Sequence, residues 1–154
     1  MRWEQGRAEI DRMLGDRELD NVPAGGEQAD RLIRQAQTHL QSAAGLAESD
    51  PPGAYALAYD AARKALTAVL ENQGLRSTST GGHIAVYEAV RARFDPPLGK
   101  VLRPFDRMRR QRRDAEYPPS DAPELTPEDV REDLEKAFAI VDMASRVLDE
   151  MAPY

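Results

Sequence analysis

Residues 51–73 read PPGAYALAYDAARKALTAVLENQ, and this stretch decides the fold class. Its apolar side chains recur at the three- and four-residue intervals of one helix face, which predicts an amphipathic helix. Asp50 is a candidate N-cap, the two prolines suit a first helical turn, and Gly74 follows as a glycine beyond the C-terminus would. The apolar stripe consists of Tyr55, Ala58, Tyr59, Ala62, Ala65, Leu66, Val69 and Leu70.

Helical spacing continues on both sides of this stretch. Upstream it predicts a short helix over about 3–19, with Trp3, Ile10, Met13 and Leu14 on one face, and a longer helix over about 27–48. Downstream, 75–82 reads as a turn, and helices are expected from His83 to about Phe94 and from Pro104 to Pro118.

The last helix is expected over about 127–151, because Thr126 and Pro127 form a helix start followed by two acidic residues. Its predicted buried residues are Val130, Leu134, Phe138, Val141, Ala144, Leu148 and Met151. No stretch of four or more residues has the alternation of a strand. The sequence therefore predicts an all-α, compact bundle of about five helices: a short helix and linker over 1–26, and the bundle over 27–154.

Composition narrows the functional classes. The chain has 154 residues and no cysteine, which excludes disulfides, thiolate metal sites and a cysteine nucleophile. No apolar run approaches the roughly 18 residues of a membrane span, and residues 1–6 lack the apolar core of a signal peptide. We therefore expect a cytoplasmic protein without membrane contact. The formal net charge is −6, so attraction for nucleic acid requires a local basic patch.

Such a patch stands at 103–113, which reads RPFDRMRRQRR and carries a formal charge of +5. On a helix, Arg103, Arg107 and Arg110 share one face, and Arg109 and Arg113 share a second. Guanidinium groups bind phosphate through two parallel hydrogen bonds, which favours a phosphate-binding ridge for RNA or a nucleotide. The alternative is a solvated helix face that pairs with the acidic start of the last helix.

Two stretches resemble the HEPN superfamily: RQRRDAEYP at 110–118, and AYDAARKAL at 58–66 with Gly74-Leu75-Arg76 and Gly82-His83 after it. The resemblance implies a helical bundle that dimerises, and it implies membership of a group rich in metal-independent endoribonucleases of toxin–antitoxin and defence systems. The motif of that group is an arginine followed, after four to six residues, by a histidine. In some systems a tyrosine two positions later is adenylylated by a partner nucleotidyltransferase.

The histidine of that motif is absent here. When the motif is aligned on an Ala-His pair, the position of the histidine falls on Glu116, behind Arg112. When it is aligned on Arg-x4-His-x-Tyr, the position falls on Ala115, and Arg110 and Tyr117 are retained. We therefore favour a protein that binds RNA or nucleotide phosphates without cleaving them. One alternative is an active nuclease in which Arg110, Arg112 and Arg113 stabilise the transition state. Protons would then be moved by Glu116, by Tyr117 or by His83 of the other protomer in a dimer. Another is an interaction module for a nucleotidyltransferase or an antitoxin, with Tyr117 as the acceptor of a modification.

Four further polar residues are candidates for a functional site or for structural contacts. His39 is expected at the surface. His83 is expected at a helix start, either as a residue packed beside the cap or, in a homodimer, facing the arginines of the other protomer. Asp60 and Arg63 are expected as a helix-packing pair or as part of a polar cleft with His83. Trp3, Tyr55, Tyr59, Tyr87 and Phe138 read as core or dimer-interface residues, and no spacing indicates a metal site or a cofactor.

Overall fold

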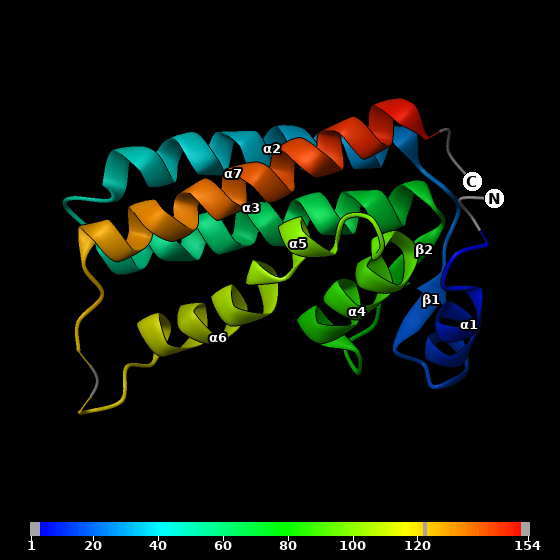
Figure 1. The fold of residues 1–154 in the computed structure, drawn as a ribbon, viewed down its shortest axis with the longest axis horizontal. Helices are drawn as coiled ribbons and strands as arrows, with labels where there is room; N and C mark the ends of the chain where they lie inside the picture. Colours follow the sequence, from blue (N-terminus) through cyan, green and yellow to red (C-terminus); the bar gives the residue numbers. More distant parts are fainter. Residues whose placement is uncertain (1–3, 122, 152–154) are drawn as a thin grey trace.

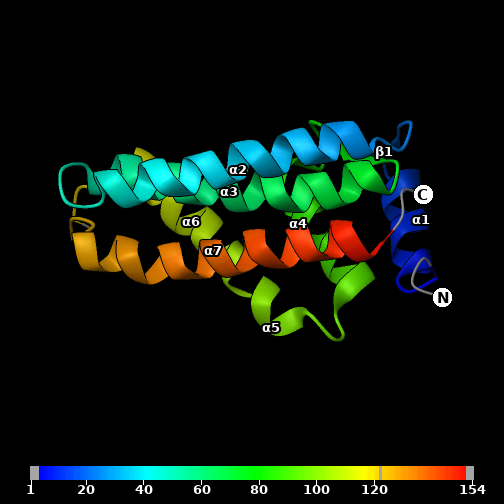
Figure 2. The same cartoon turned by 90° about the horizontal axis from the view of Figure 1, so that it is seen from above.

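A computed structural model describes residues 4–121 and 123–151 of the chain. Three long helices form its upper layer: α2 (Gly26–Leu46), α3 (Pro51–Asn72) and α7 (Pro127–Glu150). They run side by side along the long axis, and α3 contacts both of the others (Figures 1 and 2). Buried residues surround most of α3, which makes the helix predicted from 51–73 the centre of the bundle.

The capping residues predicted for two of the long helices are present in the structure. The Asp50 side chain accepts a hydrogen bond of 3.0 Å from the Gly53 N–H and caps α3, and Gly74 takes the left-handed conformation (φ +76°) just beyond the end of α3. Thr126 and Asp129 form a reciprocal capping box at the start of α7. Each side-chain cap contributes about 1 kcal/mol, so these residues fix where the helices begin.

A second layer lies beneath α3 in Figure 1 and consists of α4 (Gly82–Phe94) and α6 (Pro104–Glu116), while the short α5 (Gly99–Leu102) between them contacts α7. Both α4 and α6 contact α3, and they also contact each other. The prediction for 83–94 and for the helix from Pro104 is confirmed, whereas the single turn of α5 was not expected. This layer brings the arginine-rich helix against the centre of the bundle.

The N-terminal segment differs from the prediction. Helix α1 (Arg7–Gly15) ends four residues earlier than expected, and β1 (Leu19–Asn21) pairs antiparallel with β2 (Leu75–Ser77), where a turn was expected. In the register, Asp20 stands opposite Arg76. Strands of three residues are too short to show an alternating pattern, so the pairing is invisible to periodicity. Trp3, placed on the first helix by the sequence, lies outside the described residues.

The aromatic residues are divided between core and surface. Tyr55 and Tyr59 are fully buried, and Tyr87 packs partly buried against the core. Phe138, by contrast, is 39% exposed, so its prediction as a buried residue of the last helix is wrong. The buried face of α7 instead passes through Ala137, Ile140 and Val141, which leaves Phe138 to one side. No helix in the described part of the chain is long and apolar enough to cross a membrane.

Candidate functional site

The arginines of α6 point to two different sides of the helix. Arg107 faces α7, where its two terminal nitrogens donate to the two carboxylate oxygens of Asp133 at 2.6 and 2.8 Å. The Tyr55 hydroxyl donates to the same carboxylate at 2.6 Å. Burial alone would raise the pKa of Asp133, but the hydrogen bonds from Arg107 and Tyr55 lower it below its usual value. Arg107 is thereby engaged in holding α6 against α7.

Arg109, Arg112 and Arg113 lie on the other side of α6. They are spaced i, i+3 and i+4, so they occupy one helix face. Together with residues of α3 and of the start of α4 they line a pocket of about 290 Å³, which we call the arginine pocket. Its other lining residues are Tyr59, Gly81, Gly82, His83 and Ile84.

Each arginine of the pocket has a carboxylate on its own helix. Arg109 pairs with Asp106 at 3.1 Å and Arg112 with Glu116 at 2.8 Å, while Arg113 lies 4.0 Å from Asp114. These pairs do not exhaust the donors, because the Nε of Arg112 is buried without a hydrogen-bond partner. A buried donor without a partner is costly, and an anion in the pocket would offset that cost.

His83 joins the arginines from the first turn of α4. The Nδ1 atom of its ring lies 2.8 Å from the Tyr59 hydroxyl, so that the two side chains share a hydrogen bond. The Tyr59 ring is itself fixed by stacking on Phe105, with ring centroids 5.2 Å apart. The other ring nitrogen of His83, Nε2, is therefore the one left for proton transfer.

The electrostatic surroundings keep His83 neutral. Burial, and after it the positive charges of Arg63 and Arg112, lower the pKa of His83 below its usual value, although Asp60 acts in the opposite direction. Burial also raises the pKa of Tyr59, so that its hydroxyl keeps its proton at neutral pH. A neutral imidazole beside three arginines combines a proton acceptor with groups that stabilise negative charge.

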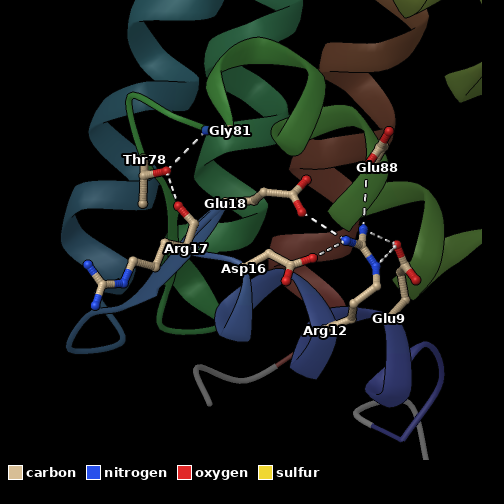
Figure 3. A network of polar contacts seen from close by, with 8 residues as sticks. All are labelled: Glu9, Arg12, Asp16, Arg17, Glu18, Thr78, Gly81 and Glu88. Atoms are coloured by element: carbon tan, nitrogen blue, oxygen red, sulfur yellow. Dashed lines mark hydrogen bonds and ion pairs between the residues drawn. The ribbon is translucent and has the colours of Figure 1, made fainter.

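The loop that carries His83 is held by the N-terminal segment, as Figure 3 shows. The Thr78 hydroxyl donates to the Arg17 carbonyl at 2.5 Å and accepts from the Gly81 N–H at 3.1 Å. Gly81 lies against Glu18, the residue that precedes β1. A Cβ atom at position 81 would stand 2.3 Å from the Glu18 carbonyl oxygen. Glycine is thus required at this position for steric reasons.

Arg12 connects the same segment to α4. Its guanidinium forms ion pairs with carboxylates of α1 and of the turn that follows, and it reaches one carboxylate of α4 at 4.0 Å (Figure 3). These carboxylates belong to Glu9, Asp16, Glu18 and Glu88. The start of α4, and with it His83, therefore depends on residues before α2.

The other predicted site residues take up separate positions. Asp60 and Arg63 form a half-buried pair at 3.8 Å on α3, near enough to affect the pKa of His83. Arg103 is exposed at the start of α6 and does not line the pocket, and Arg110 lies 3.8 Å from Asp106. Tyr117 ends α6 with 74% of its surface exposed.

A larger groove of about 880 Å³ lies between α6 and the first turns of α3 and α7. Its acidic lining residues outnumber the basic ones, Arg107 and Lys136, so the groove disfavours phosphate. These acidic residues are Asp114, Glu124, Asp129, Glu132 and Asp133. Within the described residues, no group of three or more metal-ligating side chains comes together.

Sequence reasoning found part of this pocket. It singled out Arg109, Arg112, Arg113 and His83, but it placed His83 either beside a cap or against the arginines of a partner protomer, whereas the structure brings it to the arginines of its own chain. It read Tyr59 as a core or dimer-interface residue, and this buried ring also lines the pocket. The four-residue spacing of Tyr59 and Arg63 on α3 was the available signal, since it places both on one helix face.

Comparison with known families gives one match. The family model of the HEPN domain matches residues 29–147. No curated protein and no solved structure matches the chain significantly.

Proposed function

The chain belongs to the HEPN family, and on that premise we propose that it binds phosphate groups of RNA or of a nucleotide in the arginine pocket. The observation that carries the proposal is the convergence of three arginines of α6 with His83 and Tyr59 on one small pocket. Guanidinium groups bind two phosphate oxygens through parallel hydrogen bonds, and the Nε of Arg112, a residue that lines the pocket, is a buried donor without a hydrogen-bond partner. A role in a toxin–antitoxin or defence system and a homodimeric state belong to the same proposal.

The test is binding of fluorescein-labelled single-stranded RNA, followed by anisotropy at several salt concentrations. We expect the double variant Arg112→Gln, Arg113→Gln to bind at least tenfold more weakly at low salt and to show a shallower salt dependence. Arg146→Gln is the matched control, because Arg146 is an exposed arginine paired with Asp142 on α7. Equal affinities for the double variant and the wild type would refute the proposal.

A second candidate function is metal-independent cleavage of RNA, and the contact between His83 and Tyr59 favours it. With Nδ1–H donating to the Tyr59 oxygen, Nε2 accepts the proton of a ribose 2′-hydroxyl while that oxygen attacks the adjacent phosphorus. The bond from phosphorus to the 5′ oxygen breaks, which leaves a 2′,3′-cyclic phosphate and a 5′ oxygen that takes a proton from water. The hydroxide so formed takes the proton from Nε2, which returns His83 to its neutral form. Arg112 and its neighbours stabilise the charge that develops on the phosphate oxygens.

Cleavage is tested with end-labelled RNA in excess EDTA. We expect activity in the wild type and its loss in His83→Gln, with RNA binding retained. The neutral form of His83 is the base, and the pKa of His83 is lowered. The rate should therefore rise with increasing pH and should already have reached its plateau at pH 6.5. Undiminished cleavage by His83→Gln would exclude this role for the histidine.

A further inference from the structure

The part of α3 that stays partly exposed forms one continuous strip. Six half-buried residues recur at the intervals of a single helix face, while the rest of the helix between Ala54 and Asn72 is buried. These six residues are Ala56, Leu57, Asp60, Arg63, Lys64 and Thr67.

This strip connects α2 to the arginine pocket. On one side Lys64 donates a hydrogen bond of 2.8 Å to the Nε2 atom of His39 on α2. On the other side Asp60 directly follows Tyr59, which lines the arginine pocket, and Arg63 stands one helical turn after Tyr59. Asp60 and Arg63 also affect the pKa of both histidines.

The charges on the strip are available to a ligand. Burial and the neighbouring Lys64 lower the pKa of His39, and the hydrogen bond of Lys64 goes to this ring rather than to a carboxylate. The Nε of Arg63 is buried without a hydrogen-bond partner, because the nearest Asp60 oxygen is 3.8 Å away. A cation of this kind next to a phosphate site attracts a further phosphate.

We propose that Arg63, Lys64 and His39 continue the arginine pocket across α3 and bind a further phosphate of the same strand. This inference rests on the proposed function. A pocket of about 290 Å³ encloses one phosphate with its nearest groups, and the two additional cations lie outside it. Asp60 repels phosphate, so a 2′-hydroxyl or a base amino group of the strand stands at that point and donates to the carboxylate.

The experiment compares two probes on the full chain: a twelve-nucleotide single-stranded RNA and the dinucleotide UpU, measured by anisotropy and by competition. We expect Lys64→Gln to weaken binding of the long RNA three- to tenfold at low salt, and to reduce the salt slope by about 0.7, the share of one phosphate contact on a single strand. Binding of UpU should be unchanged. Arg112→Gln should weaken both probes, because Arg112 lies in the pocket that either probe must occupy.

Two further variants serve as controls for the effect of the Lys64 charge. Lys64→Arg keeps the charge and should restore most of the affinity for the long RNA. Lys100→Gln removes the charge of an exposed lysine on α5 and should leave both probes unaffected. A thermal melt of each variant shows whether the loss of the contact with His39 has altered the fold.

The outcomes separate the two proposals. If Lys64→Gln binds the long RNA as the wild type does while Arg112→Gln binds neither probe well, the extension across α3 is wrong and the pocket stands. Equal weakening of both probes by Lys64→Gln would also overturn the extension. If Arg112→Gln leaves both probes unaffected, the proposed function itself fails.

Discussion

The junction of Tyr55, Arg107 and Asp133 allows a prediction that follows directly from geometry. We consider Asp133→Asn, which removes the charge and keeps the shape of a side chain that is 7% exposed. The amide oxygen still accepts from Tyr55, but as a neutral acceptor, and the amide NH₂ now faces one guanidinium nitrogen. A hydrogen bond to a charged group contributes about 1.5–3 kcal/mol and one between neutral groups about 1 kcal/mol.

The expected cost has two parts. Weakening of the bond from Tyr55 costs about 1 kcal/mol. The pair with Arg107 contributes no more than about 1 kcal/mol, because 47% of the Arg107 side chain is exposed and solvent screens the pair. The sum is about 2 kcal/mol at pH 7, which lowers the Tm of a chain of this length by about 4–8 °C.

The effect depends on pH with a definite sign. Folding lowers the pKa of Asp133, so its stabilisation is complete above the pKa of the unfolded chain, about 3.9, and is lost as the pH falls through the lower pKa of the folded state. Urea denaturation followed by circular dichroism at pH 7 and at pH 3 should show a gap between wild type and variant that shrinks at pH 3.

The control is Glu132→Gln, the same change at the exposed neighbouring position, which should stay within about 0.5 kcal/mol of the wild type. An equal gap at pH 3 and pH 7, or a gap no larger than that of the control, would refute the reasoning.

Four other predictions concern the site and the assembly. Gly81→Ala should lower stability by about 2 kcal/mol and reduce RNA cleavage, because its Cβ would meet the Glu18 carbonyl oxygen, while Gly45→Ala, with free space on α2, should be neutral or stabilising in the same melts. Tyr59→Phe should retain RNA binding but lower cleavage at least tenfold, with Tyr87→Phe as the matched control; equal rates for the two would contradict the role of the Tyr59 hydroxyl. Incubation with a cognate nucleotidyltransferase and ATP should add the mass of one adenylyl group to the wild type but not to Tyr117→Phe, and mass gained by that variant would place the acceptor elsewhere. Light scattering at micromolar concentration should give the mass of a dimer, and a monomer mass would remove dimerisation from the proposal.

The helical part of this fold could be predicted because its signals are local. The stripe of 51–73 repeats every three or four residues, the cap at Asp50 and the box at Thr126 each lie within one turn of helix, and all three are present in the structure. The pairing of β1 with β2 joins residues 54 or more positions apart through three-residue strands, and no local pattern encodes it. Phe138 shows the same limit, because periodicity defines a helix face but not which neighbour covers it.

Of the residues in the arginine pocket, the sequence could predict the grouping of the arginines but not the position of His83. The arginines stand close together in the sequence, so their common face follows from helix geometry. His83 reaches them through a loop whose position depends on Thr78, Gly81 and the distant Arg17. Its presence in the pocket is thus a tertiary result, and the missing histidine of the family motif gave no hint of it.

The hydrogen bond between Thr78 and the Arg17 carbonyl ties the loop before α4 to the N-terminal segment, and this contact crosses the boundary of the family match. Residues 29–147 carry the family match, whereas Arg12, Arg17 and Glu18 stand outside it. A fragment cut to the matched boundaries would keep the long helices and all the arginines, yet it would release the support on which the histidine rests. Under the proposed function, the working unit therefore extends beyond the matched residues and includes the first twenty residues of the chain.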